Sequence, residues 1–457
     1  MSGFVSKPVS WIFRKSSITW PPGGYFRLTD RTEHDGRPGV FRTVFGEPAQ
    51  MKMLVVEPKA TGHHMVAYTR FIVREAVARG WSVDLLTTKG TVKHEAFGFV
   101  RSELPDDAGI FHMDTVDKPG TAVALALMRS QNACYDAVAR GFRALLGKTV
   151  PDFVYVVNLD HFDKILALRG SPFGDVPFGG MMMSVKFHRY TMRLGPKSRN
   201  DAFYGWLFRR MLAISGLKFC AVIDEPFFDF ARAENRPVYR KLSFVPDVGE
   251  LHGELTRNEA RRSLGIADGR FVVLVFGSLM KRKGIRELFE AVRRIPETFD
   301  ILIHMAGRQN ENIRALMKTP LAEGLLLDGR LMVSSGFQDE RQEYIAFRSA
   351  DAAWVGYVQG FSGSSGVLIQ AASIGVPVIA SSNGLVGWMT GKYGLGTVVD
   401  PSDAASAARA IERLADDPAM RDRFGFNGIR FARSHTSRDF GAGVCNAIAA
   451  SAGEGIA

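Results

Sequence analysis

Two glycine-containing loops carry the residues best suited to binding an anion. The first spans residues 360–366 (GFSGSSG), between an apolar run and a helical pattern. Glycines let the backbone approach a ligand closely, and serine hydroxyls and free N–H groups at a helix start can donate to a phosphate. A flexible Gly/Ser turn is the alternative interpretation. The candidate ligand-binding residues here are Ser362, Gly363, Ser364, Ser365 and Gly366, with Gln370 one turn into the helix.

The second loop spans residues 277–284 (GSLMKRKG) and also lies between an apolar run and a helical pattern. Its candidates are Gly277, Ser278, Arg282 and Lys283. Consecutive cations at the carboxyl end of a strand suit a diphosphate, because ligands of open α/β sheets bind at that edge. An isolated KRK is more often a solvated charge run. Two such loops on one sheet edge favour the ligand interpretation.

The elements that must position these loops follow a strand–loop–helix order, which predicts parallel sheets. The fold class is therefore α/β, with two doubly wound, Rossmann-like domains. We expect an extension over 1–50, an N-terminal domain over 51–250, a C-terminal domain over 251–430 and a helix returning to the N-terminal domain over 431–457. Strands are predicted over 51–57, 82–87, 152–158, 178–187, 219–224, 242–246, 271–276, 301–306, 331–334, 352–358 and 376–381. Helices are predicted over 65–79, 125–146, 201–216, 284–294, 339–349 and 367–374.

Residues 271–430 resemble the retaining glycosyltransferases of family four (glycosyl transferases group one). That family carries G-R-L-x-x-x-K-G after the first strand of its second domain, which this chain matches at Gly277, Leu279, Lys283 and Gly284. The run AASIGVPVIAS matches the family's A-x-x-x-G-x-P-V-I-A. The resemblance implies the GT-B fold, in which two Rossmann-like domains face a central cleft. It also implies a UDP- or GDP-sugar donor as substrate and no separate cofactor.

The resemblance also implies roles for individual residues. Lys283 matches the diphosphate-binding lysine, and Arg282 or Lys281 would compensate for the family's arginine, which is Ser278 here. Two family glutamates are replaced. Ser362 stands where the glutamate that contacts the transferred sugar would be. Gln370 stands where the glutamate that binds the ribose would be, and it could still hydrogen-bond there.

The N-terminal domain offers acceptor-side candidates. Gly62, His63 and His64 lie in the loop after the first predicted strand, where the family has a glycine-rich loop facing the cleft. Lys186 and His188 close a predicted strand, and His188 resembles the family's cleft histidine near the donor sugar. We therefore take His188, Lys283 and Arg282 as the catalytic candidates. For each histidine, an ordinary core or surface role is the alternative.

The charge balance favours an anionic partner. The net charge is +11, and residues 1–250 hold 34 Lys and Arg against 25 Asp and Glu. Residues 186–218 interleave cations with aromatics, so the helix predicted from 201 is either an amphipathic helix lying on an anionic membrane or a core helix with basic flanks.

No nucleic-acid-binding module is recognisable. No Asp-x-Asp motif indicates a metal site, and no apolar run is long enough for a transmembrane helix. The three separated cysteines favour a reducing compartment, so we expect a cytoplasmic protein, with peripheral attachment to the inner face of the membrane left open.

The predicted function is transfer of a sugar, with retention, from a nucleotide diphosphate to an acceptor hydroxyl in glycan, polysaccharide or glycolipid biosynthesis. The acceptor would be a glycan or a lipid-linked sugar. Two alternatives stay open: an inactive GT-B homologue acting as a binding or scaffold subunit, and a GT-B sugar-nucleotide epimerase. The first of these alternatives is motivated by the replacement of the two family glutamates by Ser362 and Gln370.

Overall fold

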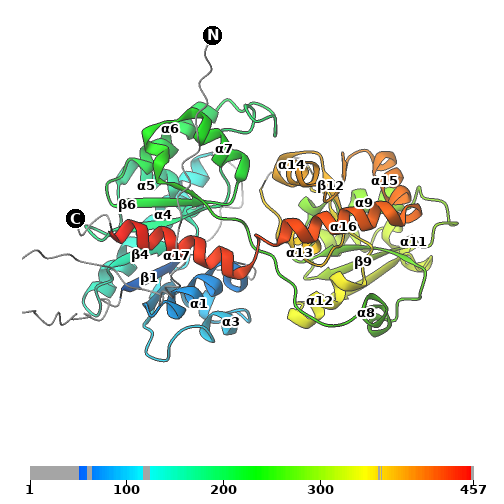
Figure 1. Cartoon of the computed structure of the whole chain (residues 1–457), viewed down its shortest axis with the longest axis horizontal. Coiled ribbons are helices and arrows are strands. Elements are labelled where there is room, and N and C mark those ends of the chain that lie inside the picture. Colours follow the sequence, from blue (N-terminus) through cyan, green and yellow to red (C-terminus); the bar gives the residue numbers. More distant parts are fainter. Residues whose placement is uncertain (1–50, 59–63, 117–123, 359–360, 362, 454–457) are drawn as a thin grey trace, which may run out of the picture. The chain divides into compact units, whose positions relative to one another are not determined.

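The computed structural model describes residues 51–58, 64–116, 124–358, 361 and 363–453. These residues form two separate parallel sheets with helices on both faces (Figure 1). Within them, no helix is both long and apolar enough to cross a membrane. The predicted fold class, α/β with two doubly wound sheets, is confirmed.

The N-terminal sheet has seven strands in the order β3-β2-β1-β4-β5-β6-β7. The strands are β1 (Lys52–Glu57), β2 (Ser82–Thr88), β3 (Ile110–Met113), β4 (Phe153–Val156), β5 (Phe178–Met182), β6 (Leu217–Val222) and β7 (Leu242–Phe244). The connecting helices are a π-helix η1 (His64–Thr69), α1 (Arg70–Ala78), α2 (Lys89–Val92), α3 (Phe97–Arg101), α4 (Ala124–Leu146), η2 (Leu159–His161), α5 (Asp163–Arg169), α6 (Asp201–Leu212), α7 (Glu225–Glu234) and η3 (Pro237–Lys241).

The C-terminal sheet has six strands in the order β10-β9-β8-β11-β12-β13. They are β8 (Phe271–Phe276), β9 (Ile301–Gly307), β10 (Leu331–Ser335), β11 (Ala352–Val355), β12 (Val378–Ser381) and β13 (Gly396–Val399). The helices of this half are α8 (Arg257–Leu264), η4 (Lys281–Lys283), α9 (Ile285–Val292), α10 (Glu311–Leu316), α11 (Pro320–Leu327), α12 (Glu340–Ser349), α13 (Gly366–Ser373), α14 (Gly384–Tyr393), α15 (Ala404–Asp416) and α16 (Pro418–Ala432).

Helices cover both faces of the C-terminal sheet. The central strand β8 has apolar side chains on both faces, and these must be buried. Every side chain of β8 is buried. Val273 and Val275 pack with α9 and α15 on one face, whereas Val272 and Leu274 pack with α12 and α13 on the other. The winding direction therefore reverses between β8 and β11, and a doubly wound sheet binds its ligand at such a point.

The last helix, α17 (Ser437–Gly453), packs against the N-terminal sheet. Phe440, Val444 and Ile448 are fully buried in the same core cluster as Met53 and Val55 of β1. The chain thus ends in the half in which its described part begins.

Some element boundaries differ from the predictions. The sequence did not predict the edge strands β3 and β13, each of four residues. The stretch 247–269, over which no helix was predicted, contains α8, which begins with a capping box between Thr256 and Glu259. The strand expected over 178–187 ends at Met182, so Lys186 and His188 do not close it. That expectation was wrong because apolar residues continue past the point where the strand pairing stops.

Candidate active site

The loop after β8 is held in one shape by close backbone contacts. Gly277 (φ +94°) and Gly284 (φ +61°) both adopt conformations that favour glycine. A Cβ on Gly284 would overlap the carbonyl oxygen of Gly356, which directly follows β11. The loop therefore packs tightly against the exit of β11 and stays at the carboxyl edge of the sheet.

Lys283 is a buried cation in this loop. It is 8% exposed, and its Nζ lies 5.5 Å from the centre of the Tyr357 ring. Its carbonyl oxygen accepts a hydrogen bond of 2.9 Å from Trp354 Nε1, which fixes the backbone. Burial lowers the pKa of the ammonium group, and among the described residues no carboxylate lies within 4.0 Å of it. A buried charge is costly unless paired, so this position favours an anionic ligand.

Arg282 is exposed but held in place by aromatic rings. Its guanidinium carbon lies 4.7 Å from the ring centre of Phe361 and 5.7 Å from that of Tyr357. Its Nε donates to Met280 Sδ at 3.0 Å. Stacking on rings leaves the outer N–H donors of an arginine available for an anion. The structure thus brings the cations of the loop after β8 beside aromatic rings of Tyr357 and Phe361, which precede α13.

The loop that precedes α13 is anchored through Ser364 and Ser365. The hydroxyls of Ser365 and Tyr357 lie 2.8 Å apart. The Ser364 hydroxyl donates to Asp247 Oδ2 in the segment that follows β7. Ser365 is the N-cap of α13, and its side chain makes no capping hydrogen bond. Ser362 lies outside the described residues.

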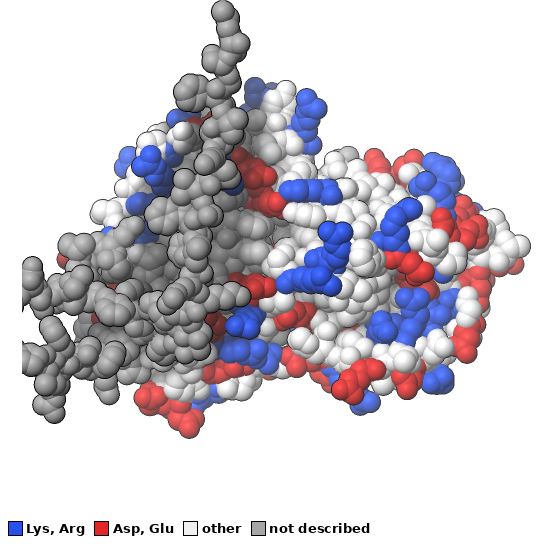
Figure 2. All heavy atoms as spheres, in the orientation of Figure 1, with Lys and Arg blue, Asp and Glu red and all other residues white. Residues whose placement is uncertain are grey.

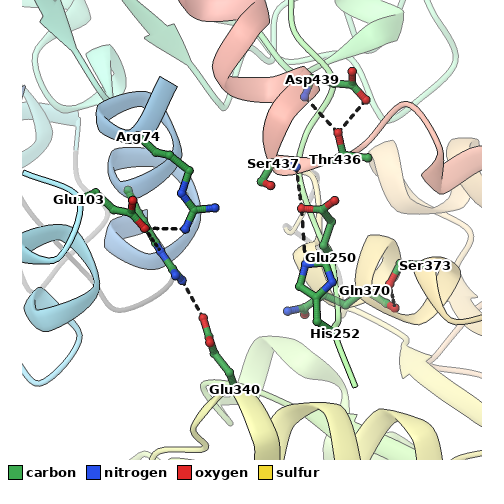
Figure 3. A network of polar contacts seen from close by, with 11 residues as sticks. Arg74, Glu103, Glu250, His252, Glu340, Gln370, Ser373, Thr436, Ser437 and Asp439 are labelled. Atoms are coloured by element: carbon green, nitrogen blue, oxygen red, sulfur yellow. Dashed lines mark hydrogen bonds and ion pairs between the residues drawn. The ribbon is translucent and has the colours of Figure 1, made fainter. Parts of the chain in front are cut away.

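Gln370 lies in α13 and is 7% exposed. Its Nε2 donates to Glu343 Oε1 of α12 at 2.7 Å. Burial raises the pKa of the Glu343 carboxyl to about 7; the hydrogen bond from Gln370 opposes that rise and Glu340 adds to it. In Figure 3, Gln370 and Ser373 extend from α13, with the Gln370 backbone oxygen accepting from the Ser373 hydroxyl. The site therefore contains a carboxylate close to Gln370, but on another helix.

The structure describes only some of the N-terminal candidates. Gly62 and His63 lie outside the described residues, and His64 begins η1. Lys186 is exposed. His188 is fully buried, with ring centres of Phe227 and Phe230 at 5.1 and 6.0 Å. The structure therefore places His188 in the N-terminal core and not on an open surface.

The comparisons with known proteins concern mainly the C-terminal half. Residues 256–431 match the family model described as "Glycosyl transferases group 1". This domain belongs to the group 1 glycosyltransferases. The predicted resemblance to the glycosyl transferases of group one is confirmed for these residues. The departures at the family's two glutamate positions make this domain a divergent member.

Three curated relatives match parts of this chain. The lipopolysaccharide core biosynthesis glycosyltransferases LpsE and LpsD of Rhizobium meliloti are 29% identical over 170 residues and 30% over 204 residues. The matches cover 37% and 43% of this chain, and 46% and 56% of the relatives. The D-inositol 3-phosphate glycosyltransferase of Pseudarthrobacter chlorophenolicus is 31% identical over 173 residues, covering 36% of this chain and 39% of that protein. The chain spans about half the length of the curated relatives it matches.

Solved structures establish the fold of this chain. Sucrose-phosphate synthase from Thermosynechococcus elongatus aligns with a TM-score of 0.65 at 17% identity, over 88% of this chain and 99% of that one. Anabaena HepE in complex with UDP and glucose aligns with a TM-score of 0.59 at 14% identity, over 88% and 100%. The lipopolysaccharide-biosynthesis glycosyltransferase WaaG aligns with a TM-score of 0.57 at 15% identity, over 86% and 98%. The fold is GT-B, as the sequence predicted.

Three carboxyl groups near the candidate residues were not identified from the sequence. Asp247 is buried and accepts from Tyr68 Oη at 2.8 Å as well as from Ser364. Glu343 pairs with Gln370. Asp160, near the carboxyl end of β4, accepts from Met183 N at 2.7 Å, and burial raises its pKa to about 6. No local motif marks these acids, because their partners are distant in sequence.

Proposed function

We propose that this protein transfers a sugar from a nucleoside-diphosphate donor to an acceptor hydroxyl with retention of configuration. The observation that carries the proposal is Lys283, a buried cation without a described carboxylate partner at the carboxyl edge of β8. It stands in a family whose curated relatives are named glycosyltransferases. The fold neighbour HepE was solved with UDP and glucose, which supports a nucleotide sugar as the donor.

In this proposal the leaving diphosphate lies between the two loops. Lys283, Arg282 and the backbone N–H groups of residues 363–366 stabilise the negative charge that develops on it. The bond from the sugar's anomeric carbon to the phosphate oxygen breaks, and the bond to the acceptor oxygen forms on the same face. The acceptor's hydroxyl proton passes to the departing phosphate oxygen. No separate protein base is then required.

The proposal predicts that Lys283→Ala lowers turnover by about 100-fold, as removal of one charge-stabilising donor does in other enzymes. The assay is nucleotide release from a panel of UDP- and GDP-sugars, with Lys283→Arg expected to retain part of the rate. Arg286→Ala is the matched control, because Arg286 is an exposed cation of α9 paired with Glu290. Full activity of Lys283→Ala would sink the proposal.

The same panel separates the alternatives. Nucleotide binding without turnover of any donor would support a binding subunit, and conversion of the donor without an acceptor would support an epimerase. We propose a glycan or lipid-linked acceptor, as in lipopolysaccharide or other glycolipid synthesis. The curated relatives named for lipopolysaccharide core biosynthesis support that class.

We further propose cytoplasmic action with peripheral attachment to an anionic membrane. Tyr190, Phe203 and Trp206 are 56%, 53% and 45% exposed, and the Phe203 and Trp206 rings stack at 6.0 Å. Lys197 lies 5.8 Å from the centre of the Tyr190 ring, and Arg210 lies 5.7 Å from that of Trp206. Lys and Arg side chains are seen around the position of α6 (Figure 2). Exposed aromatics beside cations are typical of proteins that dock at an anionic interface.

Co-sedimentation with phosphatidylglycerol vesicles tests this attachment. Phe203→Ser with Trp206→Ser should lower binding about tenfold or more, since each change removes exposed apolar area. Leu327→Ser, at a residue 87% exposed in the other half of the chain, should leave binding unchanged. Equal sedimentation of all three proteins would contradict the membrane proposal and leave the transferase proposal standing.

A further inference from the structure

The pair formed by Glu343 and Gln370 lies where two helices leave the ligand-binding edge of the C-terminal sheet. α12 begins at Glu340, shortly after β10 ends at Ser335, and α13 begins with the loop that follows β11. Both helices pack on the same face of the sheet, in one core cluster. Glu343 and Gln370 lie in the first or second turn of their helices, so their side chains meet close to the carboxyl edge.

The carboxyl group of Glu343 has unused hydrogen-bonding capacity. An ionised carboxylate accepts about four hydrogen bonds. Among the described residues, Glu343 receives a side-chain hydrogen bond from Gln370 and forms no ion pair. Burial penalises its charge, and a single neutral carboxamide compensates only part of that cost. Replacing buried charged groups by apolar side chains of similar volume is often neutral or stabilising, so packing alone does not require a carboxylate here.

A nucleotide bound at this edge presents two neighbouring ribose hydroxyls, and a carboxylate can accept hydrogen bonds from both. In Rossmann domains the acid for this role commonly follows the second strand. Here the corresponding strand, β9, ends at Gly307 and is followed by Arg308 and Gln309, neither of which is an acid. The described acid that meets Gln370 comes instead from α12.

We propose that the Glu343 carboxylate accepts hydrogen bonds from the ribose hydroxyls of the donor nucleotide. Gln370 orients this carboxylate and also contacts the ribose. This inference rests on the proposed function, because it needs a nucleotide donor in the C-terminal domain. It makes Glu343 a determinant of ribose recognition in a chain whose α13 carries a carboxamide at position 370.

Calorimetric titration of the full chain tests the inference with four probes: UDP, GDP and their 2′,3′-dideoxy forms. The wild type should bind the better ribonucleotide at least about tenfold more tightly than its dideoxy form, because a site built to accept hydroxyls discriminates against their loss. Glu343→Gln should lose most of this preference for the ribonucleotide. Its binding of the ribonucleotide should weaken, whereas its binding of the dideoxy form should stay the same. Glu340→Gln, the same change one turn earlier, should keep it.

A swapped variant separates ribose recognition from a structural role. Glu343→Gln combined with Gln370→Glu keeps one carboxylate and one carboxamide at the pair, so it should regain preference for the ribonucleotide. An unchanged ratio in Glu343→Gln would overturn the inference while nucleotide binding upheld the proposed function. Failure of the wild type to bind or turn over any nucleotide would overturn both.

Discussion

We expect Glu343 to make stability depend on pH in the absence of any ligand. Burial raises its pKa to about 7 from an ordinary value of 4.5, so the folded chain holds this proton more tightly than the unfolded chain does. The free energy of unfolding is therefore highest below pH 4.5 on this account, and it declines as the pH rises through 7. The full decline is at most about 3 kcal/mol.

Glu343→Gln should remove that decline, because a carboxamide oxygen can still accept from Gln370 without carrying a charge. We expect the variant to melt at a higher temperature than the wild type at pH 8 and at a similar temperature at pH 5. Thermal melting without nucleotide at these pH values checks this, with Glu340→Gln as the control. Equal melting temperatures of variant and wild type at pH 8 would contradict it.

At the residue scale, the sequence predicted side chains better than it predicted their partners. Lys283 and Gln370 could be found because each lies in a local motif. Glu343 lies 27 positions from Gln370, and Asp247 lies 117 positions from Ser364, so only the folded chain brings these pairs together. The burial of His188 could not be read from the sequence for the same reason, since the aromatic rings that enclose it come largely from α7.

At the scale of elements, the tight packing of the β8 loop can be tested by comparing two glycines. Gly284 and Gly329 have nearly the same φ, +61° and +66°, but only at Gly284 would an added Cβ overlap a backbone oxygen. Gly329→Ala should lower the free energy of unfolding by about 1 kcal/mol, the cost of a left-handed conformation for alanine.

Gly284→Ala should cost more than Gly329→Ala, and it should also weaken nucleotide binding by displacing the loop that carries Lys283. Urea unfolding and calorimetry with UDP or GDP measure both quantities. Equal effects of the two changes on stability and binding would show that the contact between this loop and Gly356 does not position the site.

Strand prediction succeeded where strands are buried on both faces. Phe271–Phe276 is a continuous apolar run, and its predicted bounds agree with the structure. The edge strands β3 and β13 were not predicted, because each is short and only partly buried and neither has a strong periodic pattern of hydrophobic residues. The π-helix η1 was predicted as the start of an ordinary helix, because hydrophobic spacing over six residues cannot distinguish the two.

At the scale of the whole chain, the N-terminal half depends on the last helix. Phe440 of α17 is fully buried, and its ring centre lies 5.3 Å from that of Tyr68 in η1. Residues near the end of the chain thus complete a core whose central strand, β1, begins at Lys52. This core cannot be complete until α17 has been synthesised.

Phe440→Ala should lower the free energy of unfolding of the N-terminal half by about 3 to 5 kcal/mol, because it leaves a cavity in that core. Phe426→Ala is the matched control, since Phe426 is 62% exposed on α16 and its loss should change stability by less than about 0.5 kcal/mol. Hydrogen exchange resolved by segment measures each half separately. Faster exchange should appear in β1, α1 and β6, while β8 and β11 remain protected. Uniform acceleration over both sheets would mean that the halves unfold as one unit, and α17 would then stabilise the C-terminal site as well.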